Sequence, residues 1–297
     1  MVVLSHYANW MYVEPTHPAL KEFLGTWGVY GVDIFFLLSG YGLMKSAKRS
    51  GVNARFALKR FLSAYLPYIL IVGFFVIIEG GLTSGEDVLK LLTGYDYWYM
   101  YVLFAFYIIF IVLYNVPKVN LILMTASVAG FSFWLYSQDR ADFWILSNAA
   151  FLLGIYMAAA ENVNEKIFAA KWMRIALPAV GIIGTALFAY LYAANPILSL
   201  EMCRSIFFTI AMAGIIINIR GFGVVLCSMG TYSLYIYLMH TRLFWKVVMM
   251  HDGWNYVLNC LLAALVTVII CLPLGFALEW LIGLAFKKIL PVRREEK

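Results

Sequence analysis

The feature that most constrains this sequence is a succession of apolar segments that are long enough to cross a lipid bilayer. A helix needs about 20 mainly apolar residues to cross the hydrocarbon layer. Of the 297 residues, 64% are hydrophobic and only 13% are charged, and the mean hydropathy is +0.84. A soluble domain of this length has no interior large enough for so much apolar surface. We therefore expect an all-α, polytopic membrane helix bundle that forms one domain over residues 1–297.

The apolar segments predict about ten transmembrane helices, of which the first is truncated. The first segment, Met1–Tyr12, is shorter than a full span and lacks the basic start of a signal peptide. Pro15 and Pro18 predict that Glu14–Phe23 is a polar loop. The other segments are Leu24–Lys45, Phe61–Ile78, Trp98–Tyr114, Leu121–Tyr136, Phe143–Ala160, Ile175–Ala194, Ser205–Ile219, Gly230–Met250 and Asn255–Phe286.

The positions of the basic residues predict the orientation of the chain in the membrane. Six cations and no acid lie between Lys45 and Arg60, and short loops with this bias face the cytoplasm. If the segments alternate from there, sixteen of the 22 lysines and arginines are cytoplasmic, among them Lys118 and the C-terminal cations. Arg204 then belongs to an outer loop. We expect a multi-pass protein of the cell membrane with both termini inside, and the net charge of +6 does not indicate nucleic acid.

Three apolar segments carry ionisable side chains that are costly in a bilayer. Asp33 lies within the apolar run Gly28–Lys45, where a carboxylate costs roughly 2.5 to 3.5 kcal/mol on insertion scales. His6 lies on the first segment at a similar expected depth, so the two side chains can meet, while His240 is expected near the middle of the membrane. A carboxylate beside an imidazole fixes its tautomer and makes it a better general base. Burial alone is equally compatible with polar contacts that hold helices together.

The segment Gly31–Tyr41, which reads GVDIFFLLSGY, closely resembles the GVDxFFxxSG signature of the acyltransferase-3 family. Members of that family are integral membrane enzymes that transfer acyl groups, most often acetyl, to carbohydrates. Two more stretches are similar to family segments: Arg55–Tyr68, an arginine-rich entry to the third helix, and Gly230–His240, which reads GTYSLYIYLMH. In the family the first helix begins earlier and carries an arginine about three turns before its histidine. The resemblance therefore implies that the N-terminal edge of the domain is missing here.

The resemblance also implies roles for individual residues. His6 falls on the presumed catalytic histidine, Asp33 would orient it, and His240 would assist at the carbonyl or the acceptor. His6 would deprotonate an acceptor hydroxyl or carry the acyl group transiently. Arg60 would hold the phosphates of acetyl-CoA, although the positive-inside rule and anionic lipid explain most of the basic run. Tyr237 and Arg242 would contact the substrate, and the aromatic segment Tyr97–Tyr101 remains outside the predicted site.

We therefore expect an acyltransferase that moves an acetyl group from acyl-CoA to a hydroxyl of an envelope or extracellular polysaccharide. Acetyl-CoA is the expected co-substrate, and glycan, bilayer and polysaccharide assembly proteins are the expected partners. The sequence has no HExxH, GxSxG or Walker motif and no paired Cys/His set, so we expect no metal. One alternative is a transporter or flippase for a glycan or acyl carrier, since buried ionisable and aromatic residues also suit such a path. A second is a family member that only scaffolds polysaccharide assembly.

Overall fold

The computed structural model describes residues 1–10, 18–160, 171–218, 232–243 and 256–289. These residues are helical almost throughout, and no strand occurs within these ranges. Among the described residues, seven helices are long and apolar enough to cross a membrane, or eight if a bent pair is taken as one span. The predicted all-α, polytopic class is confirmed. The predicted number of ten spans stays a prediction, because the segments at Met1–Tyr12 and Gly230–Met250 extend beyond the described residues.

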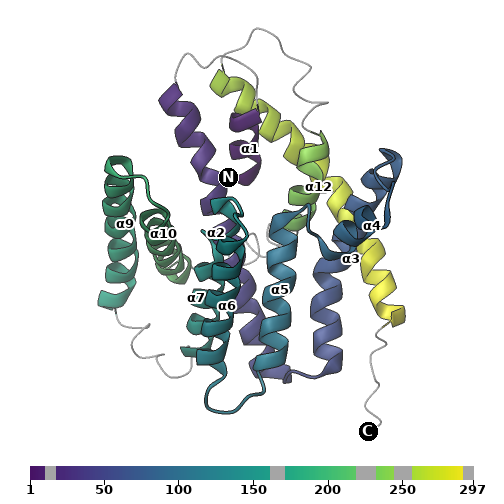
Figure 1. Cartoon of the computed structure of the whole chain (residues 1–297), viewed down its shortest axis with the longest axis horizontal. Helices are drawn as coiled ribbons and strands as arrows, with labels where there is room; N and C mark the ends of the chain where they lie inside the picture. Colours follow the sequence, from purple (N-terminus) through teal and green to yellow (C-terminus); the bar gives the residue numbers. More distant parts are fainter. Residues whose placement is uncertain (11–17, 161–170, 219–231, 244–255, 290–297) are drawn as a thin grey trace. The chain divides into compact units, whose positions relative to one another are not determined.

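Figure 1 labels the helices in chain order. Their bounds are α1 Val2–Trp10, α2 Pro18–Ser50, α3 Ala54–Ile78, α4 Gly85–Thr93, α5 Trp98–Leu113, α6 Asn120–Ser137, α7 Asn148–Ala160, α9 Lys171–Ala194, α10 Leu198–Asn218 and α12 Tyr256–Ile289. A 3₁₀ turn, η1, covers Asp142–Trp144, and a further helix covers residues 232–243.

Several predicted boundaries are wrong, and two of them have clear local causes. The predicted loop Glu14–Phe23 is wrong over residues 18–23, because α2 begins at Pro18; proline suits the first turn of a helix, where its missing N–H needs no partner. Residues 14–17 lie outside the described part. The helix α10 begins at Leu198, seven residues before the expected start, so Arg204 lies inside a helix and not in an outer loop. Arg204 pairs with Glu201 one turn earlier at 2.7 Å, so these charges do not end the helix.

The chain divides into two compact units, and α2 and α5 contribute residues to both. The first unit comprises Met1–Val2, Thr26–Val52 and Val102–Gly223, and the second comprises Val3–Gly25, Asn53–Tyr101 and Val224–Lys297. Some residues at the edges of these ranges lie outside the described part. The assignment of the whole chain to one membrane domain stays a prediction.

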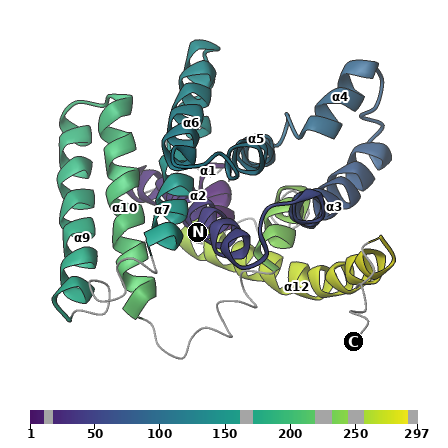
Figure 2. The ribbon, with the colours of Figure 1, turned by 90° about the horizontal axis from the view of Figure 1, so that it is seen from below.

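In the first unit, α9 and α10 form a hairpin whose helices lie side by side in both views (Figures 1 and 2). The helices α2 and α7 approach each other through two glycines. A Cβ atom at Gly40 would lie 2.1 Å from the carbonyl oxygen of Phe151, and one at Gly154 would lie 2.0 Å from that of Leu37. Small residues allow such backbone contact in membranes. The glycine of the SG pair in the GVDIFFLLSGY motif therefore has a packing role.

In the second unit, α1 packs on the first turns of α2 and on α12. The buried cluster consists of apolar residues from these three helices: Tyr7, Ala8, Leu24, Cys260 and Ala263. The helix α12 has 34 residues, and its apolar stretch Leu258–Leu284 has 27. At 1.5 Å per residue, that stretch is roughly 40 Å long.

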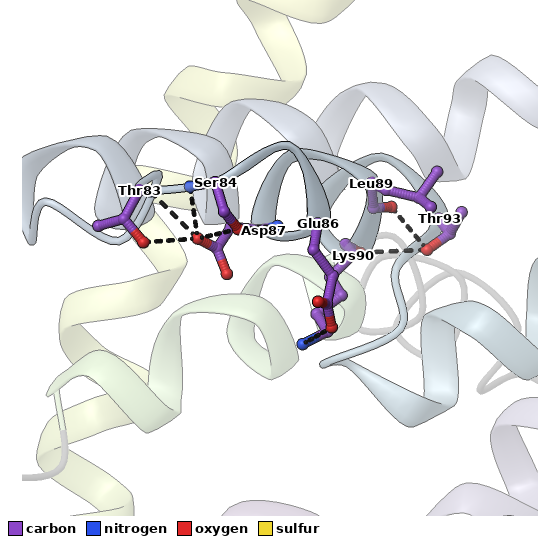
Figure 3. A network of polar contacts seen from close by, with 7 residues as sticks. All are labelled: Thr83, Ser84, Glu86, Asp87, Leu89, Lys90 and Thr93. Atoms are coloured by element: carbon purple, nitrogen blue, oxygen red, sulfur yellow. Dashed lines mark hydrogen bonds and ion pairs between the residues drawn. The ribbon is translucent and has the colours of Figure 1, made fainter.

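The apolar segments did not predict α4, a short amphipathic helix between the spans α3 and α5. Asp87 accepts hydrogen bonds from the hydroxyls of Thr83 and Ser84 and from the Ser84 N–H, while Ser84 accepts one from the Asp87 N–H (Figure 3). The bonds from Thr83 and Ser84 lower the pKa of the Asp87 carboxyl to about 2, so this cap stays ionised at any higher pH. The axes of α4 and α5 meet at a bend of 62°.

Candidate active site

Two imidazoles from distant parts of the chain meet in the second unit. His6 lies on α1 and His240 lies on the helix over residues 232–243. Nδ1 of His6 is 2.7 Å from Nε2 of His240, and the rings are stacked with centroids 4.9 Å apart. His240 is fully buried, whereas His6 is partly exposed. The structure therefore brings together two of the three residues that the sequence predicted to be catalytic.

The neighbours of His6 on α1 hold the helix in place. The Ser5 hydroxyl donates a hydrogen bond to the carbonyl oxygen of Gly25 on α2, at 2.5 Å. The buried Tyr7 hydroxyl forms a hydrogen bond with the hydroxyl of Thr267 on α12 and also contacts the His240 carbonyl oxygen at 3.4 Å. Three helices thus fix the side of α1 that carries His6. A fixed imidazole is better suited to proton transfer than a mobile one.

Tyr237 lies one turn before His240 and supports it. The Tyr237 carbonyl oxygen is 2.5 Å from Nδ1 of His240, and the two rings have centroids 5.6 Å apart. The Tyr237 ring also meets Tyr99 edge to face at 5.1 Å. Tyr237 therefore contacts the pair through its backbone and its ring, and the substrate contact predicted for it stays a prediction.

Arg242 is held by two residues that the sequence analysis did not include in the site. Its guanidinium forms an ion pair with Glu79, the C-terminal cap of α3, and donates to the Tyr97 hydroxyl at 3.3 Å. Tyr97 belongs to the aromatic segment Tyr97–Tyr101, which was identified in the sequence but left outside the predicted site, so a signal for it existed. Glu79 had no comparable signal, because it lies in a loop region without a motif. The predicted substrate contact of Arg242 is untested.

Arg60 lies at the opposite end of α3 from Glu79. Nineteen residues separate the two positions, which is roughly 28 Å along a helix. The Arg60 guanidinium lies over the Phe56 ring at 5.7 Å and is partly exposed. The nearby Arg55 and Lys59 give this end of α3 a positive charge that suits phosphates. The predicted contact of Arg60 with the donor phosphates stays a prediction.

Asp33 belongs to the first unit, so its predicted contact with His6 stays a prediction. Within its unit Asp33 is fully buried, and its Oδ1 accepts a hydrogen bond from the Ser205 hydroxyl at 2.6 Å. Its Oδ2 has no hydrogen-bond partner among the described residues. A buried carboxylate oxygen without a partner is costly and is commonly part of a functional site.

A second charged group lies close to Asp33 in the first unit. Arg204 is 8% exposed, pairs with Glu201 at 2.7 Å and lies over the rings of Tyr30 and Tyr192 at 5.7 and 5.1 Å. It is also close enough to act electrostatically on Asp33. This cluster was not predicted, because Arg204 lies between the predicted spans Ile175–Ala194 and Ser205–Ile219 and was assigned to the outer side. The sequence did contain a signal for this cluster, because the ionisable Arg204 directly precedes the predicted span Ser205–Ile219.

Comparison with known proteins identifies the family. A family model described as "Acyltransferase domain", that of the acyltransferase-3 family, matches residues 1–276. No curated protein and no solved structure matches the chain. The match covers both imidazoles, Asp33 and the GVDIFFLLSGY motif. Since it extends over most of the chain, the earlier resemblance is confirmed, and the chain belongs to the acyltransferase-3 family of membrane acyltransferases.

Proposed function

We propose that this membrane acyltransferase transfers an acetyl group from acetyl-CoA to a hydroxyl of an envelope or extracellular polysaccharide, with His6 as general base. The observation that carries the proposal is the contact between His6 and the buried His240. Two imidazoles at 2.7 Å, fixed by three helices, form a site where a proton can be taken up and returned. Family membership supports the transfer of an acyl group. The acetyl donor and the glycan acceptor are proposals by analogy with the family.

The reaction needs only the donor, the acceptor and the imidazoles. His6 takes the proton of the acceptor hydroxyl as its oxygen bonds to the thioester carbonyl carbon. The carbon–sulfur bond then breaks, and the proton returns from His6 to the sulfur, which leaves as the free thiol of coenzyme A. Because the proton is taken and returned by one group, atoms and charge balance without a metal or a redox partner.

Charged residues outside the pair would position the two substrates. Arg60, at the basic end of α3, would bind the donor phosphates. Tyr237 and Arg242, near the other end of α3, would contact the acceptor, since aromatic faces stack on sugar rings and the guanidinium binds anionic groups. The role predicted for Asp33 beside His6 stays a prediction, because the two residues belong to different units. We further propose that both termini are cytoplasmic, as the positive-inside rule predicts, and that the acceptor belongs to the cell envelope.

Release of free thiol tests the proposal directly. Purified protein in liposomes receives acetyl-CoA and de-O-acetylated polysaccharide from the same organism, and thiol is measured with a colorimetric reagent. We expect release with the natural protein and a loss of about 100-fold or more with His6→Ala. Ser137→Ala, at the exposed end of α6, serves as the control and should match the natural protein.

The alternatives give different outcomes in the same experiment. A transporter or flippase consumes no thioester, so it would move polysaccharide across the liposome without releasing thiol. A scaffold would release no thiol, and its His6→Ala variant would complement a deletion strain as well as the natural protein. Either result would contradict the proposed acyl transfer.

A further inference from the structure

The tautomer of His240 follows from its contact with the peptide backbone. Nδ1 of His240 is 2.5 Å from the carbonyl oxygen of Tyr237. A carbonyl oxygen can only accept a hydrogen bond, so Nδ1 of His240 must carry a proton. A neutral imidazole carries one proton, and a second charge in this buried pair would be costly. Nε2 of His240 therefore presents a lone pair.

The tautomer of His6 then follows from the contact between the rings. Nε2 of His240 accepts, so Nδ1 of His6, at 2.7 Å, must donate. The single proton of neutral His6 is thus on Nδ1, and its Nε2 carries the lone pair. Two hydrogen bonds, both directed toward the Tyr237 carbonyl, determine which nitrogen of His6 is basic.

We infer that His240 is a positioning residue that makes Nε2 of His6 the proton-accepting atom of the proposed acyl transfer. This inference rests on the proposed function. When Nε2 takes the proton of the acceptor hydroxyl, the charge of the His6 imidazolium is shared through the Nδ1–H···Nε2 bond with His240. At the other end of these two hydrogen bonds, the dipole of the Tyr237 carbonyl stabilises the positive charge on His240. In a carboxylate–histidine pair, the carboxylate fixes the tautomer of the imidazole and stabilises its positive charge. Here the second imidazole and the peptide carbonyl have this role for His6.

Two conservative variants of His240 test separately its hydrogen bond to His6 and its hydrogen bond to the Tyr237 carbonyl. Asparagine places an amide N–H near Nδ1, so His240→Asn keeps the bond to Tyr237 but has no acceptor for His6. Glutamine places its oxygen near Nε2, so His240→Gln keeps the acceptor for His6. With acetyl-CoA and de-O-acetylated polysaccharide, we expect His240→Gln to keep kcat within about tenfold and His240→Asn to lose about 100-fold. KM for acetyl-CoA should stay the same in both, because the inference gives His240 a contact with His6 and none with the donor.

The tautomers can also be measured without any turnover. The variant with His17→Gln and His251→Gln leaves His6 and His240 as the only histidines. With ¹⁵N-labelled histidine, both remaining rings should show a protonated Nδ1 and an unprotonated Nε2. A coupling across the hydrogen bond should join Nδ1 of His6 to Nε2 of His240.

The inference is overturned if His6 carries its proton on Nε2, or if His240→Asn is as active as His240→Gln. These results can be distinguished from a failure of the proposed acyl transfer, because thiol release and the nitrogen pattern are measured separately. A protein that never releases thiol but shows the expected nitrogen pattern has the predicted tautomers and a different activity. A protein that releases thiol with the opposite pattern is an acyltransferase that uses another atom of His6.

Discussion

At the scale of single residues, the side chains of the candidate site contact partners that lie far away in the sequence. His6 and His240 were both identified as candidates, but nothing in the sequence indicates that residues 234 positions apart share a hydrogen bond. The same holds for Glu79 and Arg242, whose contact depends on how α3 packs beside the helix over residues 232–243. Motifs identify chemically unusual positions, whereas contacts between distant helices depend on packing that the motif does not encode.

The bond between Ser205 and Asp33 provides a test at this scale. Ser205→Ala leaves Oδ1 of a buried carboxylate without its donor, which we expect to lower the free energy of unfolding by about 1 to 3 kcal/mol. Thr209→Val is the matched control, because the Thr209 hydroxyl donates to the carbonyl oxygen of Ser205 on its own helix and not to Asp33. Thermal unfolding of the purified protein in detergent measures both. Equal midpoints for the two variants would show that Ser205 does not stabilise Asp33.

At the scale of helices, the length of the apolar segments predicted where most spans lie. Some helix ends were predicted wrongly, because charged residues were taken to mark the start or end of a helix. The start of α10 was predicted too late because Glu201 and Arg204 look like loop residues in the sequence. In the structure they neutralise each other, and two aromatic rings cover the guanidinium. The basic loop was likewise predicted too long, since α2 continues to Ser50 and Lys48 donates to the last carbonyls of α7. A helix ends where its backbone loses partners, not where its side chains become polar.

The contact between α2 and α7 provides the test at this scale. Gly40→Ala would place a methyl group 2.1 Å from the Phe151 carbonyl oxygen, so the helices must separate. We expect a loss of about 1 to 3 kcal/mol in the free energy of unfolding, as in other overpacked interiors. Gly42→Ala, on the same helix, meets nothing within 4 Å and should leave stability unchanged or slightly higher. A thermal midpoint of Gly40→Ala that equals that of Gly42→Ala would contradict this helix contact.

At the scale of the whole molecule, the sequence predicted the class correctly, because 64% apolar residues exclude a soluble domain. The two-unit division was not foreseen, since α2 and α5 are each continuous helices that contribute to both units. No change in hydropathy marks the positions where these helices pass from one unit to the other. The orientation of the spans rests on the positive-inside rule.

Reporter fusions test that orientation. Fusion after Lys118, between α5 and α6, should give a fluorescent cytoplasmic reporter and inactive alkaline phosphatase. Fusion after Asp139, between α6 and α7, should give the opposite result, and fusion at the C-terminus should agree with Lys118. Active phosphatase at Lys118 would invert the proposed topology and place the basic residues outside.

The helix α12 is longer than the hydrocarbon layer is thick, and it contacts α1, which carries His6. Its apolar stretch is roughly 40 Å long, against about 30 Å of hydrocarbon in a typical membrane, so it must tilt or thicken the lipid around it. The same helix carries Thr267, whose hydroxyl meets Tyr7 beside His6. A change in lipid chain length that alters the slope of α12 should therefore reach α1, the helix that carries His6, the proposed general base. Acyl transfer by this protein should vary with the lipids in which it is reconstituted.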